Sequence, residues 1–423
     1  MYKLVSIIML LSQFVLGTIN FNEFFYDKTL RIDYIHSGNN ESDNYFLDEL
    51  IEEPYWGGSK TNLLDIFDYG EYKFEVYDLE SNKAIYSRTY STLFREWQTT
   101  AEAKSVSKAF TESVVFPFPK REVKVIFFSR NDENKFIPKY ELKINPKNYF
   151  IKKENRLKFS HFKVHYSGET DKKVDIVIIP EGYTSGDMEL FKKDCSKFTK
   201  YLFNSSPYKE NQDRFNVWGV EAPSVEKGTD IPAEDKWVKT NVNTSFFTFD
   251  VERYLMTSDY KSVRDLAANA PYDQIYILVN TNKYGGGAIY NFYSVAVNVN
   301  PREEYVFVHE FGHGFAFLAD EYYDSETAYE EFYPLNLEPL EPNLTTLVNF
   351  ESKWKNMISE GTPIPTPNED KYKDKVGLFE GGGYVSKGVY RPKYDCSMKS
   401  ASVDNYCPVC RDAITKMIKF YTE

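Results

Sequence analysis

The strongest constraint on this chain lies in residues 306–324, which read VFVHEFGHGFAFLADEYYD. His309 and His313 are four residues apart, so on an α-helix they lie on one face, one turn from each other. Both imidazoles could then bind one zinc ion at about 2.0–2.1 Å. Glu310 is placed beside them to take a proton from water at that ion. We therefore predict a helix with the zinc ligands His309 and His313 and the catalytic base Glu310.

The two histidines could instead be ordinary core or surface residues, because an HExxH pattern also arises by chance. The chain has only five histidines, so such a chance match is on the order of one in a few hundred. The low frequency favours the zinc interpretation.

A zinc ion that catalyses hydrolysis normally takes a third ligand from the protein. In the metzincin pattern HExxHxxGxxH, a glycine lets the helix break and the last residue, His or Asp, return to the metal. Here Ala316 and Ala319 occupy those two positions, and Asp320 follows one position later. On an unbroken helix Asp320 would lie about 10 Å along the axis from His313. Asp320 can therefore bind the metal only if the helix ends near residues 317–319 and the chain turns.

Three other side chains compete with Asp320 for this role. Glu321 is its neighbour, whereas His161 and His165 are remote in the sequence. Asp320 and Glu321 could also form a solvated acidic corner or part of a calcium site. We favour Asp320 as the third ligand.

The N-terminal part of the chain, residues 18–150, has the pattern of an all-β unit. Short runs rich in β-branched and aromatic residues occur without intervening helices, and turn signals such as HSGNNES and RNDEN separate several of them. These runs are residues 29–36, 71–80, 83–90, 121–130 and 139–146. Repeated short strands of this kind predict a β-sandwich.

From residue 160 to residue 423 the pattern changes to strands alternating with helices. An apolar run at 176–179, ended by Pro180 and Gly182, suggests a buried strand that is followed by a helix at 188–203, and further strands are expected at 214–223 and 273–281. A glycine-rich turn then leads into a fourth strand within 285–299. This order predicts an α/β catalytic domain with a mixed sheet, and the whole chain therefore belongs to the α+β class.

Charge and hydropathy exclude several kinds of partner. The net charge is −12 and no basic block occurs, so nucleic acid and anionic membrane surfaces are poor partners. Residues 1–17 have a positive start, a short apolar core and a small-residue end, which is typical of a signal peptide. No later stretch is apolar enough for a transmembrane segment, and no cysteine precedes Cys195 to anchor a lipoprotein. We expect export to the periplasm or beyond the cell, and the oligomeric state stays open.

Four cysteines occur, and three of them lie close together near the C-terminus: Cys195, Cys396, Cys407 and Cys410. In an exported protein, clustered cysteines most often form disulfides. A structural zinc site is the alternative, but the sequence shows no second CxxC or histidine pair to complete it. We favour a disulfide, with its pairing undetermined.

The chain resembles the family of IgA-specific zinc metalloendopeptidases over nearly its whole length. Motifs that carry this resemblance are DKTLRIDYIHSG, YGEYKFEVYD, YSRTYSTLFREWQTT, VDIVIIPEGYT, YGGGAIYNFYSVAV, HEFGH with LADEYY, GVYRP, CSM and CPVC. The resemblance implies that His309 and His313 bind zinc, that Glu310 is the base, and that the LADEY segment supplies Asp320. It also implies that Met398 forms the methionine turn below the metal.

Together these features predict a secreted zinc-dependent endopeptidase that binds an extended polypeptide, such as immunoglobulin A or other host or dietary proteins. Residues 285–297 would form the upper edge of the cleft and pair with the substrate. Tyr390, Tyr394 and Tyr406 are candidates for stabilising the oxyanion, and residues 325–385 are expected to cover part of the cleft. The alternatives are a catalytically silent adhesin and a zinc amidase acting on cell-wall peptides.

Overall fold

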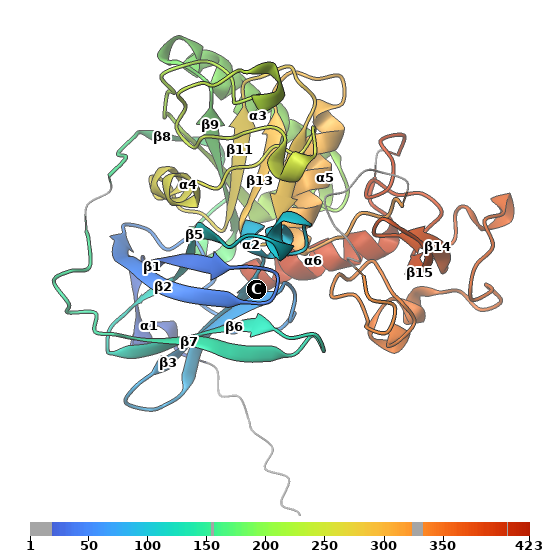
Figure 1. The fold of residues 1–423 in the computed structure, drawn as a ribbon, viewed down its shortest axis with the longest axis horizontal. Helices are drawn as coiled ribbons and strands as arrows, with labels where there is room; N and C mark the ends of the chain where they lie inside the picture. The colour runs from blue at the N-terminus through green and yellow to red at the C-terminus, as the bar shows by residue number, and fades with distance from the viewer. Residues whose placement is uncertain (1–18, 154–155, 324–332, 404) are drawn as a thin grey trace, which may run out of the picture.

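The structure is a computed structural model, and it describes residues 19–153, 156–323, 333–403 and 405–423. The predicted signal peptide, residues 1–17, lies outside these described residues. In Figure 1 a β-rich N-terminal unit lies below an α/β unit, and the hairpin of β14 (Phe379–Gly382) and β15 (Val385–Arg391) lies to one side.

The N-terminal unit is built from two antiparallel sheets. The first has the strand order β2-β1-β5 and the second the order β4-β3-β6-β7. In β3, the alternate residues Tyr72, Phe74 and Val76 are buried, and they share one core with Leu30 and Ile32 of β1. The bounds are β1 (Phe25–Gly38), β2 (Asp43–Glu53), β3 (Tyr72–Asp78), β4 (Ala84–Tyr90), β5 (Lys108–Pro119), β6 (Val123–Arg130) and β7 (Phe136–Ile144), with short helices α1 (Phe21–Phe24) and α2 (Leu93–Gln98).

The second unit contains a six-stranded mixed sheet in the order β12-β13-β11-β9-β10-β8. The four inner strands run parallel, and the two outer strands, β12 and β8, are antiparallel to their neighbours. The bounds are β8 (His161–His165), β9 (Val174–Glu181), β10 (Phe215–Val220), β11 (Gln274–Val279), β12 (Gly286–Ile289) and β13 (Tyr293–Val297). The predicted α+β class, with an N-terminal sandwich and a C-terminal mixed sheet, is confirmed.

Helices cover both faces of this sheet, which is why β9 is buried along its whole length. Ile176 and Ile178 face a core shared with α3 (Met188–Asn204), α5 (Glu303–Ala316) and α6 (Pro408–Thr422). Val177 and Ile179 face the opposite core, which contains α4 (Tyr260–Ala267). Figure 1 shows α4 and α5 on opposite sides of the sheet. In the part of the chain that the structure describes, no helix has the length and apolar character needed to cross a membrane.

The region predicted as a glycine-rich turn and one strand is instead a hairpin of β12 and β13. Gly286 and Gly287 belong to β12, and their lack of a side chain allows other chain segments to pack close to this strand. A Cβ atom at Gly287 would lie 2.5 Å from the sulfur of Met256 and would collide with it. The turn itself falls at residues 290–292, where Asn291 has a φ of 51°.

The sandwich is joined to the α/β unit close to this hairpin. Arg31 on β1 forms an ion pair of 2.6 Å with Asp265 on α4. The amide of Ser91 donates to the carbonyl of Tyr290 at 3.0 Å, and the Asn291 side chain donates to the carbonyl of Thr89 at 2.9 Å. The N-terminal unit therefore contacts the β12–β13 edge of the sheet directly.

A final hairpin, β14 (Phe379–Gly382) with β15 (Val385–Arg391), completes the described strands.

Candidate metal centre

Helix α5 is held in the core by an apolar face and begins with two acidic residues. Glu303 and Glu304 occupy its first turn, where negative charge is favourable near the helix dipole. Phe307, Phe311 and Phe315 are buried, and the Phe307 ring stacks on Tyr276 of β11 at 4.0 Å. Burial of each such ring stabilises the fold by about 1.5–3 kcal/mol. The opposite face of the helix is thereby fixed relative to the edge of the sheet.

The helix ends at Phe317, which adopts the left-handed conformation with φ 53° and ψ 37°. The amides of Phe317 and Leu318 donate to the carbonyls of His313 and Gly312. This conformation costs a non-glycine residue roughly 1–2 kcal/mol. Ring contacts with Tyr69 at 5.6 Å and Tyr290 at 4.9 Å hold Phe317 in place. The helix therefore breaks where the ligand prediction requires it to break.

Beyond this break Asp320 returns to the two histidines. The Nε2 atoms of His309 and His313 lie 3.1 Å apart. Asp320 Oδ1 lies 3.1 Å from His309 Nε2 and 3.4 Å from His313 Nε2. Ligand atoms at 2.0–2.1 Å from a tetrahedral zinc are separated by about 3.4 Å. The three atoms therefore fit around one such ion, and Asp320 Oδ1 is buried with no hydrogen-bond partner among the described residues.

Each histidine is oriented by a hydrogen bond that its Nδ1 atom makes to a backbone carbonyl. His309 Nδ1 donates to the carbonyl of Ser397 at 2.9 Å, and His313 Nδ1 donates to the carbonyl of Leu318 at 2.5 Å. Because a carbonyl only accepts, both Nδ1 atoms carry the proton and both Nε2 lone pairs point toward Asp320. The second carboxylate oxygen of Asp320 accepts a hydrogen bond from the hydroxyl of Tyr384.

The carboxylate of Asp320 and the two imidazoles shift each other's pKa values. Burial lowers the pKa of His313, but the charge and hydrogen bond of Asp320, together with Glu310 and the Leu318 carbonyl, outweigh burial and raise that pKa to about 9. Burial acts to raise the pKa of Asp320, yet His313 and His309 hold it well below its usual range. Burial raises the pKa of Glu310, against the opposing effect of the two histidines.

The competing ligand candidates lie elsewhere. Glu321 Oε1 lies 3.2 Å from Cys410 Sγ and accepts from the Asn343 side chain at 3.1 Å, so Glu321 is turned away from the histidines. His161 and His165 lie on β8, at the opposite edge of the sheet from β12. The structure brings Asp320, and none of these three residues, to His309 and His313.

Met398 lies beneath α5, as the family resemblance implies. Its side chain is buried, and a Cβ atom at Gly312 would approach the Met398 sulfur to 3.1 Å and the Tyr406 hydroxyl to 2.8 Å. The Met398 carbonyl accepts from the amide of Glu321 at 2.8 Å. This bond ties the chain below the helix to the segment that carries Asp320.

His309, Glu310, His313 and Asp320 line a cavity of about 610 Å³. One wall is β12, and another comes from the N-terminal unit through Arg95, Glu96, Arg130 and other residues. Tyr322 and Tyr384 line this cavity, whereas Tyr390, Tyr394 and Tyr406 do not. Tyr406 instead donates to the carbonyl of Val308. Sequence reasoning missed Tyr384, whose available signal was its place directly after three glycines.

Two family profiles match the chain. The profile described as IgA Peptidase M64 matches residues 162–373 and 368–418, and the profile described as Peptidase M64 N-terminus matches residues 20–141. The chain belongs to the IgA Peptidase M64 family. Comparison with curated proteins gave no match.

As a member of the M64 family, the chain is a peptidase, and its substrates are polypeptides. The family consists of metallopeptidases, and the described residues contain two groups that could hold a metal ion. One is His309, His313 and Asp320, which opens onto the cavity. The match to the M64 N-terminal profile also covers the sandwich residues that form the second wall of this cavity.

Proposed function

We propose that this M64 peptidase is an exported zinc-dependent endopeptidase with Glu310 as its catalytic base. The observation that carries the proposal is the convergence of His309 Nε2, His313 Nε2 and Asp320 Oδ1 at the wall of the cavity. Two imidazoles and one carboxylate are a ligand set typical of catalytic zinc, which keeps a further position for water or substrate. Export is supported by the signal-like residues 1–17.

Zinc bound at this group would polarise the scissile carbonyl and lower the pKa of a water molecule to about 7. Glu310 takes a proton from the attacking water and delivers it to the leaving amine. Its half-buried carboxyl group has a raised pKa, which suits a residue that must both accept and release a proton. Gly286 leaves room for this carboxyl group, because a Cβ atom there would lie 3.3 Å from Glu310 Oε1.

Strand β12 supplies an edge on which an extended substrate can pair. The amide of Gly286 donates to the carbonyl of Arg253, and the carbonyl of Gly286 accepts from Leu255, both at 3.2 Å. Backbone groups of alternate strand residues point to the same side, so those of Ala288 also point away from β13. Among the described strands, β13 is the one that pairs with β12. Substrate pairing is therefore expected at Ala288.

Glu310→Gln tests the catalytic role. It should lower kcat by about 10²–10⁴-fold because proton transfer is lost, while zinc content and folding stay as in the unchanged protein. The matched control is Glu304→Gln on the exposed side of the same helix, which should cleave peptides normally. Wild-type cleavage by the Glu310→Gln protein would contradict the proposal.

The substrate class is tested separately. The family name and the predicted export favour immunoglobulin A or other host or dietary proteins as substrates. Purified protein should cleave some members of a peptide library internally, and a chelator should stop this cleavage. Incubation with immunoglobulin A then decides whether that protein is among the substrates. Release of single terminal residues, with no internal cleavage, would contradict the endopeptidase assignment.

A further inference from the structure

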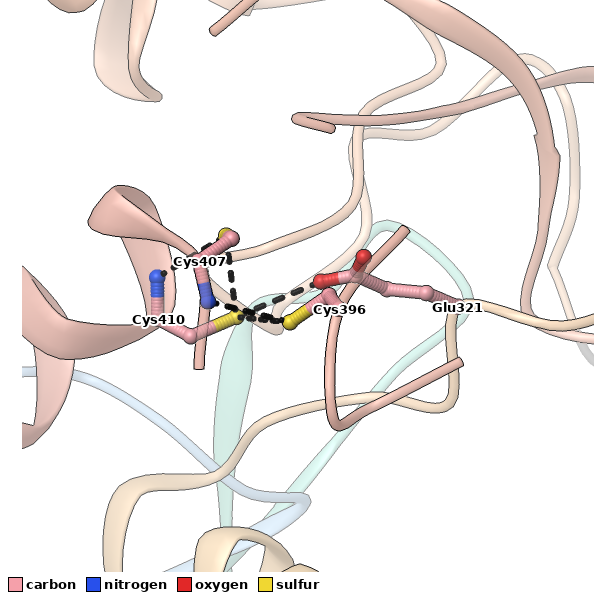
Figure 2. A group of neighbouring side chains, drawn as sticks. All are labelled: Glu321, Cys396, Cys407 and Cys410. Carbon is pink, nitrogen blue, oxygen red and sulfur yellow. Dashed lines mark hydrogen bonds between the residues drawn. The ribbon is translucent and has the colours of Figure 1, made fainter. Parts of the chain in front are cut away.

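A second group of ligand-type side chains lies in the core next to the candidate catalytic site. It consists of Glu321, Cys396, Cys407 and Cys410, each of them buried. One ligand atom from each residue lies within 4.8 Å of the others. Figure 2 shows the three cysteines and the carboxylate directed toward one another.

The distances in this group do not describe a disulfide. Cys410 Sγ lies 3.5 Å from Cys407 Sγ and 3.8 Å from Cys396 Sγ, whereas bonded sulfurs lie about 2.05 Å apart. All four cysteines of the chain are free thiols in the structure. The disulfide favoured from the sequence is therefore not formed. The three sulfurs and the carboxylate instead form one cluster in which no two sulfurs are bonded. Any single disulfide among them would leave one thiol and the Glu321 carboxyl group buried beside it.

The same distances match a tetrahedral zinc site. Sulfurs at about 2.3 Å from zinc in a tetrahedron are separated by about 3.8 Å, and a sulfur and a carboxylate oxygen by about 3.5 Å. The sulfur–sulfur distances of 3.5 Å and 3.8 Å, and the 3.2 Å from Cys410 Sγ to Glu321 Oε1, lie close to these ligand–ligand distances. The other carboxylate oxygen, Glu321 Oε2, is buried with no hydrogen-bond partner among the described residues.

The backbone around the cysteines also suits thiolate ligands. The amide of Cys407 points to the sulfur of Cys396 at 3.2 Å, and the amide of Cys410 points to the sulfur of Cys407 at 3.5 Å. Such N–H donors stabilise negative charge on sulfur. Cys407 is the N-cap of α6 and Pro408 begins the helix, so the positive end of the helix dipole lies at the cluster.

We propose that Glu321, Cys396, Cys407 and Cys410 bind a second, structural zinc ion. The set is closed, with four protein ligands and no contact with the cavity, as is typical of structural zinc. Its ligands come from three separate segments: the loop after α5, the loop that contains Met398, and the start of α6. A zinc ion bound there would cross-link these three segments.

This second site supports the first one through neighbouring residues. Asp320 precedes Glu321, and Ser397 follows Cys396. Asp320 is the candidate third ligand of the catalytic metal, and the Ser397 carbonyl accepts from His309 Nδ1 at 2.9 Å. A zinc ion on Glu321 and Cys396 thus fixes the positions of two groups that orient the catalytic ligands.

Metal and thiol content of the full chain test the proposal. We expect two zinc ions per chain, and we expect all four cysteines to react with an alkylating reagent in denaturant with chelator and without reductant. Two unreactive cysteines would reveal a disulfide and overturn the proposal. A single zinc ion that is lost from His309→Ala/His313→Ala would also overturn it, because that ion would belong to the catalytic group.

Variants and cobalt distinguish this site from the catalytic one. His309→Ala/His313→Ala should keep one ion, and cobalt in its place should give the thiolate-to-cobalt absorption of a sulfur-rich site. Cys407→Ser should lose that ion, whereas Cys195→Ser, a buried cysteine on α3, should keep it. If Cys407→Ser fails to fold, the cobalt spectrum of the histidine variant decides. A wild-type protein with one sulfur-bound ion would instead contradict the proposed function and leave the structural site standing.

Discussion

Asp320 and Glu321 are neighbours in the sequence, yet they belong to two different groups of ligand-type residues. Asp320 faces His309 and His313 in the wall of the cavity, and Glu321 faces three cysteines in the core. The first group has three ligand-type residues and opens onto the cavity, and the second has four and is buried. A zinc ion with three protein ligands keeps a fourth coordination position for water or substrate. A zinc ion with four protein ligands has no such position and serves a structural role.

The difference also concerns how each group is assembled. His309 and His313 come from one helix, which is fixed by its packing on the sheet. The cysteine group instead draws its side chains from three segments, because it joins two loops to the start of α6. We therefore expect metal at the first group to control activity, and metal at the second group to control folding of the segments around it.

Chelation should have the largest effect and should separate the two groups in time. The ion at the open group should leave first and take peptide cleavage with it, while near-ultraviolet circular dichroism stays unchanged. The enclosed ion should leave later, together with loss of that signal. Zinc content, activity and circular dichroism measured over one time course test this order. Loss of both ions in a single step would remove the distinction between the groups.

Asp320→Asn and Glu321→Gln form the sharpest pair of substitutions. Asp320→Asn removes the charge that faces both imidazoles, so kcat/KM should fall by about 10²–10³-fold, as when a buried charge partner worth several kcal/mol is lost. Glu321→Gln should reduce activity less and thermal stability more. Kinetics and thermal unfolding of both proteins give the comparison. Equal losses of activity in the two variants would show that the groups do not act separately.

Cys407→Ser should act mainly on stability. Loss of a structural ion should lower the free energy of unfolding by roughly several kcal/mol and Tm by about 10 °C. Cys195→Ser serves as the control, because Cys195 is a buried cysteine outside both groups. Calorimetry on the two variants tests this expectation. A larger fall in Tm for Cys195→Ser than for Cys407→Ser would argue that ordinary packing explains the effect.

The parts of this protein that could be predicted from the sequence are those whose pattern is local. HExxH fixes three residues on one helical turn, and the apolar run at residues 176–179 identifies a strand that the structure places inside the sheet as β9. The alternation of Tyr72, Phe74 and Val76 likewise identifies one face of the sandwich. In each case the spacing within one element determines which side chains lie together.

The remaining features depend on residues that are distant in the sequence. The break at Phe317 has no glycine or proline to indicate it, and it is held by Tyr69 and Tyr290 from two distant loops. The place of Glu321 among the cysteines depends on how two loops fold onto α6, so the sequence favoured a disulfide instead. The sandwich wall of the cavity is likewise a tertiary feature with no catalytic spacing of its own.

Tyr384→Phe should have the smallest effect, and it tests how the open group is held. The Tyr384 hydroxyl donates to Asp320 Oδ2 and thereby leaves Oδ1 directed at the histidines. Loss of such a supporting bond typically costs 10–100-fold in metal affinity or activity. Titration of zinc into the metal-free protein should show this loss at the open group alone, because Tyr384 does not belong to the cysteine group. Tyr390→Phe is the matched control, since Tyr390 does not line the cavity. Unchanged zinc affinity and unchanged activity in Tyr384→Phe would mean that the packing around Asp320 alone sets its direction.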